Sequence, residues 1–234
     1  MNFKKSKKTF LLLFILIFPS AFYVYLTAGK EESFVRLPYF GPKHPLIINK
    51  DGKVKKDTIF YAIPEFKFSN QIGNKITALS MRHHIWVCCF EHLKDKNLSP
   101  SLTTLINRVE SRTDLDTTLR LLTFALDSES TQTLSAYANM VHAGRRQYFL
   151  SADTGKMENF AKSAFYQPLD SSTKNGFVHF FLIDREGCVR GMYNGTHIKE
   201  VDELIDNISM LEAAYYVLEN REKSKKGGEP DDAM

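Results

Sequence analysis

Cysteine is scarce in this chain: there are three in 234 residues, and their spacing suits no obvious thiol site. An odd number leaves at least one cysteine without a partner inside the chain. Cys88 and Cys89 are adjacent in a predicted strand, where neighbouring side chains point to opposite faces, so they cannot readily pair with each other. Cys188 lies far along the sequence. The pattern favours buried, small apolar side chains over a disulfide framework.

A general excess of positive charge is also lacking. Lys and Arg number 31 against 27 Asp and Glu, and this difference equals the four lysines at positions 4, 5, 7 and 8. No acidic residue precedes Glu31, so the remainder of the chain is electrically balanced. A balanced domain gives no electrostatic footprint for a phosphate backbone, and we expect no nucleic-acid partner.

Charged residues are absent from Phe10 to Thr27, a stretch rich in Leu, Ile and Phe. As a helix this stretch spans roughly 27 Å, close to the hydrocarbon thickness of a bilayer. We predict a basic cytoplasmic tail at 1–9 and a single-pass transmembrane signal-anchor at 10–28, with the bulk of the chain periplasmic at the cell membrane. A cleaved leader and a buried core helix are the alternatives, although residues 26–29 make a poor cleavage site.

After the predicted anchor, prolines and glycines indicate a semi-extended linker at 29–45. Turn residues at 49–52 and 70–74 then predict two N-terminal β-hairpin extensions.

From Ile85 onward, strand and helix patterns alternate. Strands are predicted at 85–90, 119–126 and 148–150, followed by a hairpin of 178–183 with 189–193; helices are predicted at 100–111, around 134–141, around 157–164 and from about 199. This order predicts an α/β, thioredoxin-like fold over 46–220, with a central mixed sheet and helices on both faces. A charged, glycine-rich tail at 221–234 is expected to be disordered.

The stretch from Ile85 to Pro100 has the layout of an active-site loop. A strand ends there, and Ser99 followed by Pro100 predicts an N-cap and the first turn of a helix. Many α/β folds place thiol, metal or anion chemistry at this point. However, no cysteine lies between Glu91 and Pro100.

Several phrases make the chain resemble the SCO/SenC family of membrane-anchored, thioredoxin-fold copper proteins, in the form found in Bacteroidetes. They are RLPYFGPK at 36–43, IPEFKFSNQIGNKIT at 63–77, FALDSESTQTLSAYA at 124–138, FLIDREGCVRGMYNGT at 181–196 and VDELIDNISMLE at 201–212. The resemblance implies copper delivery to cytochrome oxidase or thiol reductase activity.

The resemblance also shows where the working residues of that family would fall. Its Cys-Pro-x-x-Cys-Pro motif aligns with 95–100, which puts Asp95 and Ser99 at the two cysteine positions, and its metal-binding histidine aligns near Gly176. A carboxylate and a hydroxyl cannot exchange disulfides, and they are poor ligands for copper. They are also too few to hold a hard cation.

A displaced metal site is one alternative. Cys89 at the strand end, His92 in the loop and His179 from a neighbouring strand are candidate ligands, whereas a core cysteine and a solvent-facing histidine are the structural explanation. Asp95 lacks a placed partner for general acid–base catalysis.

We therefore expect a degenerate SCO-type protein, leaning towards no enzymatic activity and with no catalytic residue assigned. It would act as a non-redox binding or assembly factor linked to respiratory-oxidase or copper homeostasis, with a protein partner in oxidase assembly. A copper metallochaperone that uses the displaced Cys/His site is the alternative. A thiol-disulfide oxidoreductase would require a reactive, low-pKa thiol.

Overall fold

The computed structural model describes residues 14, 17–19, 22, 37–50, 53–94, 98–113, 118–165 and 179–226. Leu37–Met234 form one compact unit, and Met1–Arg36 form another. Within the described residues no helix has the length and apolar character needed to cross a membrane. The predicted anchor at 10–28 lies almost wholly outside those residues.

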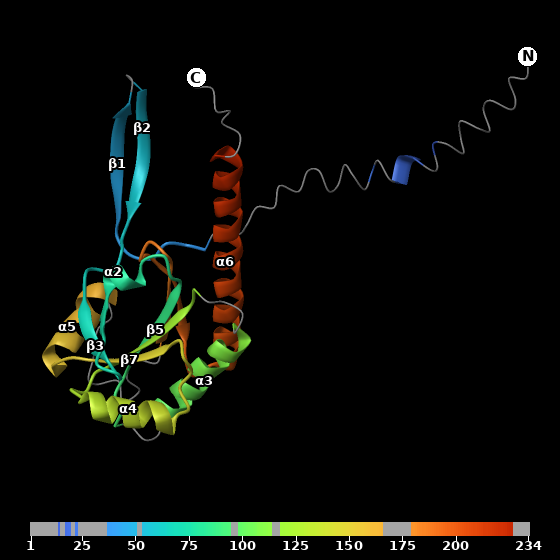
Figure 1. Cartoon of the computed structure of the whole chain (residues 1–234). Coiled ribbons are helices and arrows are strands. Elements are labelled where there is room, and N and C mark those ends of the chain that lie inside the picture. The colour runs from blue at the N-terminus through green and yellow to red at the C-terminus, as the bar shows by residue number, and fades with distance from the viewer. Residues whose placement is uncertain are drawn as a thin grey trace, which may run out of the picture. The chain divides into compact units, whose positions relative to one another are not determined.

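A seven-stranded mixed sheet forms the centre of the compact unit (Figure 1). Its order is β4-β3-β7-β6-β5-β8-β9, and its strands are β3 Lys67–Asn70, β4 Lys75–Thr77, β5 Trp86–Glu91, β6 Arg120–Ala125, β7 Gln147–Ser151, β8 His179–Ile183 and β9 Val189–Asn194. β5, β6 and β7 run parallel, whereas β8 is antiparallel to β5 and β9. The predicted mixed sheet is confirmed.

The central strand β5 divides the core into two layers. Its residues are buried throughout, as expected for a strand covered on both faces. Trp86, Cys88 and Phe90 face a phenylalanine-rich layer, while Val87 and Cys89 face a mainly aliphatic layer. The prediction that the adjacent cysteines point to opposite faces is confirmed.

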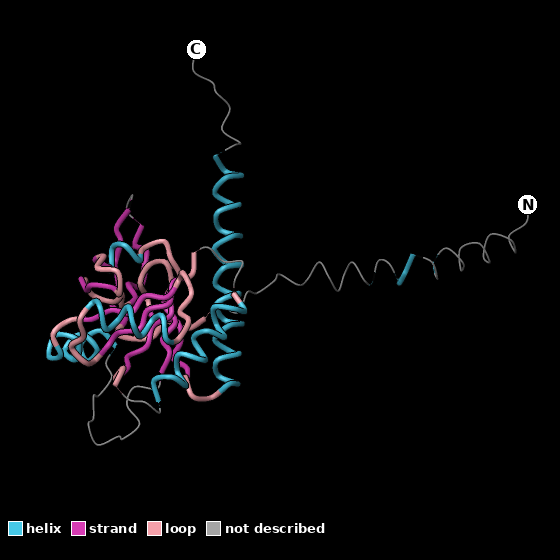
Figure 2. Tube along the Cα trace, turned by 60° about the horizontal axis from the view of Figure 1, so that its bottom comes forward, coloured by secondary structure: helices cyan, strands magenta, loops and turns pink. Residues whose placement is uncertain are grey.

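Helices cover both faces of the sheet, as Figure 2 shows in a second view. They are α2 Ala78–Met81, α3 Leu98–Arg112, α4 Thr131–Met140, α5 Thr154–Phe165 and α6 Ile198–Lys226. The apolar side of α5 packs into the phenylalanine-rich layer, and α3 and α6 share the aliphatic layer. α4 packs on Phe149 of β7.

The two predicted hairpins differ in their placement. β1 (Lys43–Lys50) and β2 (Lys53–Phe60) make a separate two-stranded sheet that stands out from the main sheet (Figure 1). β3 and β4 instead form the edge of the main sheet, because β3 pairs with β7. The second hairpin is therefore part of the core sheet and not an extension.

Two predicted helix ends also differ from the structure. α3 begins at Leu98, so Ser99 lies in the first turn and is not the N-cap. α6 continues through Lys226, into the tail predicted at 221–234. Strong helix formers such as Glu and Lys extend this helix, and Gly227 and Gly228 are the first pair of residues that disfavour it.

Candidate functional site

The loop after β5 is the candidate site predicted from the sequence. β5 ends at Glu91 and α3 begins at Leu98. Of the two positions that align with family cysteines, Ser99 belongs to the first turn of α3, and Asp95 lies outside the described residues. Gly176, which aligns near the metal histidine, also lies outside them.

One ion pair and two hydrogen-bonding contacts hold the described part of this loop to the next loop. The Nδ1 atom of His92 lies 3.1 Å from Oδ1 of Asp127, and the amide of Lys94 donates to Oδ2 of Asp127 over 3.4 Å. The ammonium of Lys94 lies 3.1 Å from Oε1 of Glu129, and this hydrogen bond raises the pKa of Lys94. The described loop thus presents paired charges and contains no thiol.

Asp127 and Glu129 are partners that the sequence reasoning missed. Both follow β6, which runs parallel to β5 and ends at the same edge of the sheet. Parallel strands bring their carboxyl ends together at one edge of a sheet. The acidic residues directly after the strand predicted at 119–126 were therefore the sequence signal for these contacts.

Cys89 lies in the aliphatic layer and is fully buried. Its Sγ donates to Oε1 of Glu91 over 3.2 Å and lies 3.6 Å from Oγ1 of Thr123. Burial, followed by the negative charge of Glu91, raises the pKa of the Cys89 thiol well above its ordinary value. A nucleophile or soft-metal ligand must be a thiolate, and this site disfavours that form.

The other two cysteines are also protonated thiols. All three cysteines are free and buried. Burial raises the pKa of Cys88 well above its ordinary value and that of Cys188 to about 11. None of the three is therefore a low-pKa thiol of the kind that redox enzymes use.

The three predicted metal ligands occupy different surroundings. Cys89 is buried, His92 is exposed, and His179 is a half-buried residue of β8 that pairs with Asn194 of β9. In the part of the chain that the structure describes, no group of three His, Cys, Asp or Glu residues could hold a metal ion. The predicted set thus gains no support there and stays a prediction. Copper prefers soft thiolates, and burial disfavours the thiolate form of Cys89.

The sequence reasoning also missed a polar cluster around Arg190, which we call the linker clamp (Leu37, Pro38, Tyr39, Asp184 and Arg190). The guanidinium of Arg190 donates to the carbonyl of Leu37 over 2.6 Å and to the carbonyl of Pro38 over 3.2 Å. It also donates to Oδ2 of Asp184 over 3.0 Å and lies 3.9 Å over the Tyr39 ring. The middle of the predicted linker is therefore bound to β9.

Asp184 fixes the other side of this cluster. It is fully buried, and its Oδ1 accepts hydrogen bonds from the amides of Cys188 at 2.8 Å and Glu186 at 3.1 Å. Burial raises the pKa of this carboxyl, although Arg190 and the amides act in the opposite direction. Two of the phrases that carry the family resemblance, at 36–43 and 181–196, thus meet in space. In the sequence, the signal for this cluster was an Asp and an Arg, Asp184 and Arg190, close to the turn of a predicted hairpin.

Comparisons with known proteins show what the chain is similar to. No family model matches it. It is 22% identical over 166 residues to the "SCO1 protein homolog" of Bacillus subtilis (strain 168), which covers 67% of this chain and 86% of the relative.

Solved structures show the same fold. The structure of BsSco, described as a member of the Sco family of cytochrome c oxidase assembly proteins, matches with a TM-score of 0.57 at 20% identity, over 64% of this chain and 92% of that one. A SCO1/SenC family lipoprotein from Bacillus anthracis str. Ames matches with a TM-score of 0.58 at 19% identity, over 64% and 95% of the two chains. The thioredoxin-like fold predicted from the sequence is confirmed.

Proposed function

This chain is related to the SCO/SenC family, and on that premise we propose that it is a binding or assembly factor that performs no thiol redox chemistry. Its context is respiratory-oxidase assembly or copper homeostasis, as the family resemblance implies, and the description of BsSco supports the first of these. The proposal includes a cytoplasmic tail at 1–9, a single-pass membrane anchor at 10–28 and a periplasmic domain. The proposal assigns no catalytic residue.

The state of the cysteines carries this proposal. The three thiols are free and buried, and burial raises the pKa of each. A disulfide requires Cβ atoms about 3.5–4.5 Å apart with converging side chains, and Cys88 and Cys89 face opposite layers. The family resemblance places Asp95 and Ser99 at the positions of its cysteine pair.

The described loop suits recognition better than chemistry. Asp127 binds His92 and the Lys94 amide, and Glu129 binds the Lys94 ammonium, so these contacts restrain the loop before any partner arrives. A restrained surface loses little conformational entropy on binding. A partner protein could therefore bind this loop at a low entropic cost. Such binding would involve no electron transfer.

The experiment uses residues 37–234, which contain every buried core residue of the described chain. Maleimide labelling is counted in native buffer and in urea, and insulin reduction is measured in parallel. We expect almost no labelling of the native protein, three labels per chain in urea, and no insulin reduction. Measurable insulin turnover would refute the proposal.

The same labelling experiment distinguishes the proposed non-redox factor from the alternative, a copper metallochaperone. Rapid native labelling that Cu(I) suppresses, and that a Cys89→Ser variant abolishes, would favour the displaced Cys89, His92 and His179 set. Labelling that is slow and unaffected by Cu(I) would count against it.

A further inference from the structure

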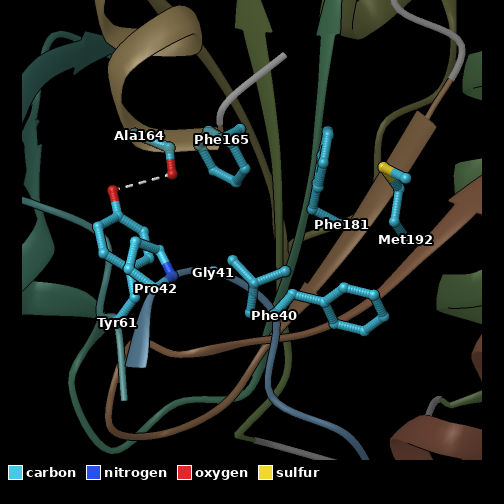
Figure 3. Close-up of a pocket in the computed structure, with 9 residues that line it drawn as sticks. Phe40, Gly41, Pro42, Tyr61, Ala164, Phe165, Phe181 and Met192 are labelled. Atoms are coloured by element: carbon cyan, nitrogen blue, oxygen red, sulfur yellow. Dashed lines mark hydrogen bonds between the residues drawn. The ribbon is translucent and has the colours of Figure 1, made fainter. Parts of the chain in front are cut away.

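A cavity of about 310 Å³ opens on the side of the main sheet where α5 packs (Figure 3). It lies beside the end of α5 and the β8–β9 hairpin, and it is separate from the charged loop after β5. Its lining residues are Phe40, Gly41, Pro42, Tyr61, Ala164, Phe165, Phe181, Val189 and Met192. Four segments distant in sequence therefore build one cavity.

Hydrogen bonds between these segments hold the walls in place. The amide of Phe40 donates to the carbonyl of Val189 over 2.9 Å, which fixes the linker to β9. The amide of Tyr61 donates to the carbonyl of Pro42 over 3.2 Å. The Tyr61 hydroxyl donates to the carbonyl of Ala164 over 3.0 Å, as the dashed line in Figure 3 marks. The cavity is thus formed before a ligand arrives.

The chemistry of the lining favours a neutral aromatic ligand. None of the nine residues is charged, and Phe40, Tyr61, Phe165 and Phe181 supply four aromatic rings. The rings of Phe165 and Phe181 lie 4.7 Å apart at 55° to each other, a tilted arrangement that leaves edges and faces for a further ring. A charged ligand would lose its hydration without gaining a partner from these side chains.

The entrance offers an adaptable apolar contact. Phe40 and Met192 are 42% and 43% exposed although both line the cavity. Figure 3 shows Tyr61 and Met192 on opposite sides of the view, with Phe181 between them. A methionine side chain is flexible and makes favourable contacts with aromatic rings.

We propose that this cavity is a binding site for a neutral small molecule that carries one or two fused aromatic rings. A cavity of roughly 150 Å³ accommodates benzene, and this one is about twice as large. The proposal goes beyond the assembly role and does not depend on it.

The test is calorimetric titration of residues 37–234 with 2-naphthol, a neutral molecule with two fused rings, at pH 7. We expect saturable binding of one molecule per chain. The charged analogue 2-naphthalenesulfonate should bind at least about tenfold more weakly, because its sulfonate loses hydration in an uncharged cavity.

Two tryptophan variants locate the site. Met192→Trp places a bulky ring at the entrance and should weaken 2-naphthol binding at least about tenfold by occupying the space. Met140→Trp is the matched control, since Met140 is also exposed, at 62%, but belongs to α4 and does not line the cavity. Its binding should equal that of the unmodified protein, and urea unfolding checks that both variants fold.

Three results would overturn the proposal: no saturable 2-naphthol binding, equal binding by Met192→Trp and Met140→Trp when both fold, or equal affinity for the sulfonate. None of them bears on thiol labelling or insulin reduction, so the assembly role is tested separately.

Discussion

Cys88 and Cys89 show how one residue of offset changes the surroundings of a side chain. Cys88 lies in the phenylalanine-rich layer, and the structure gives its thiol no hydrogen bond among the described residues. Cys89 lies in the opposite layer, where its thiol contacts Glu91 and Thr123. A polar replacement should therefore be tolerated differently at the two positions.

We predict that Cys88→Ser lowers the free energy of unfolding by about 2 kcal/mol, because a hydroxyl is buried without a partner. Cys89→Ser should cost less than about 1 kcal/mol, since its hydroxyl can donate to Glu91. Urea unfolding of the two variants measures both values, and each is the other's control. Equal losses, or a larger loss for Cys89→Ser, would contradict the assignment of their faces.

At the scale of secondary-structure elements, Glu200 joins β9 to α6. It lies in the first turn of α6, where the helix dipole favours negative charge. Its Oε2 accepts a hydrogen bond of 2.5 Å from the Asn194 amide of β9, and its Oε1 lies 3.3 Å from Nδ1 of His197. The Asn194 amide, and then His197, lower the pKa of Glu200.

Because the pKa of Glu200 is lowered, we predict that the effect of Glu200→Gln on the free energy of unfolding depends on pH. A carboxyl whose pKa is lower in the folded state stabilises the protein above its unfolded pKa, near 4.5, and this contribution is lost as the pH falls through the folded value. The unmodified protein should therefore be more stable than the variant at pH 6–7, and the difference should narrow below about pH 4.5. Urea unfolding across this range provides the measurement. A stability difference between the unmodified protein and the variant that widens towards low pH would contradict the stabilising role assigned to the Glu200 carboxylate.

Local patterns predicted most elements but not how they are placed. The buried strand β5 agrees with the strand predicted at 85–90, and α4 agrees with the helix predicted around 134–141. The position of β3 beside β7 depends on pairing between distant segments, which no local pattern encodes.

The candidate site was harder to predict for the same reason. The opposite faces of Cys88 and Cys89 follow from strand geometry alone. The partners Asp127 and Glu129, and the linker clamp, arise where chain segments far apart in sequence meet. Whether Cys89, His92 and His179 lie close enough to share a metal ion likewise depends on the whole fold.

At the scale of the whole molecule, the linker clamp makes part of the predicted linker belong to the domain. Leu37 is buried, and Arg190 binds the carbonyls of Leu37 and Pro38 while it stacks on Tyr39. The domain thus begins nearer to Leu37 than to the predicted boundary at residue 46.

Two truncations test this boundary. Removal of residues 1–36 should leave the free energy of unfolding of the domain nearly unchanged. Removal of residues 1–42 should lower it by about 3 kcal/mol, because the buried guanidinium of Arg190 loses its carbonyl partners. Denaturant unfolding compares the two truncated chains. Equal stability would show that the clamp does not stabilise the domain.

The central claim is that the domain has a thioredoxin-like scaffold without thiol chemistry. It is tested most directly by comparing urea unfolding midpoints of reduced and oxidant-treated protein, for the unmodified domain and for an Asp95→Cys, Ser99→Cys double variant. We predict no redox-dependent shift in the unmodified domain and a higher midpoint for the oxidised double variant, in which a new disulfide constrains the unfolded chain. A redox-dependent shift in the unmodified domain would contradict the account.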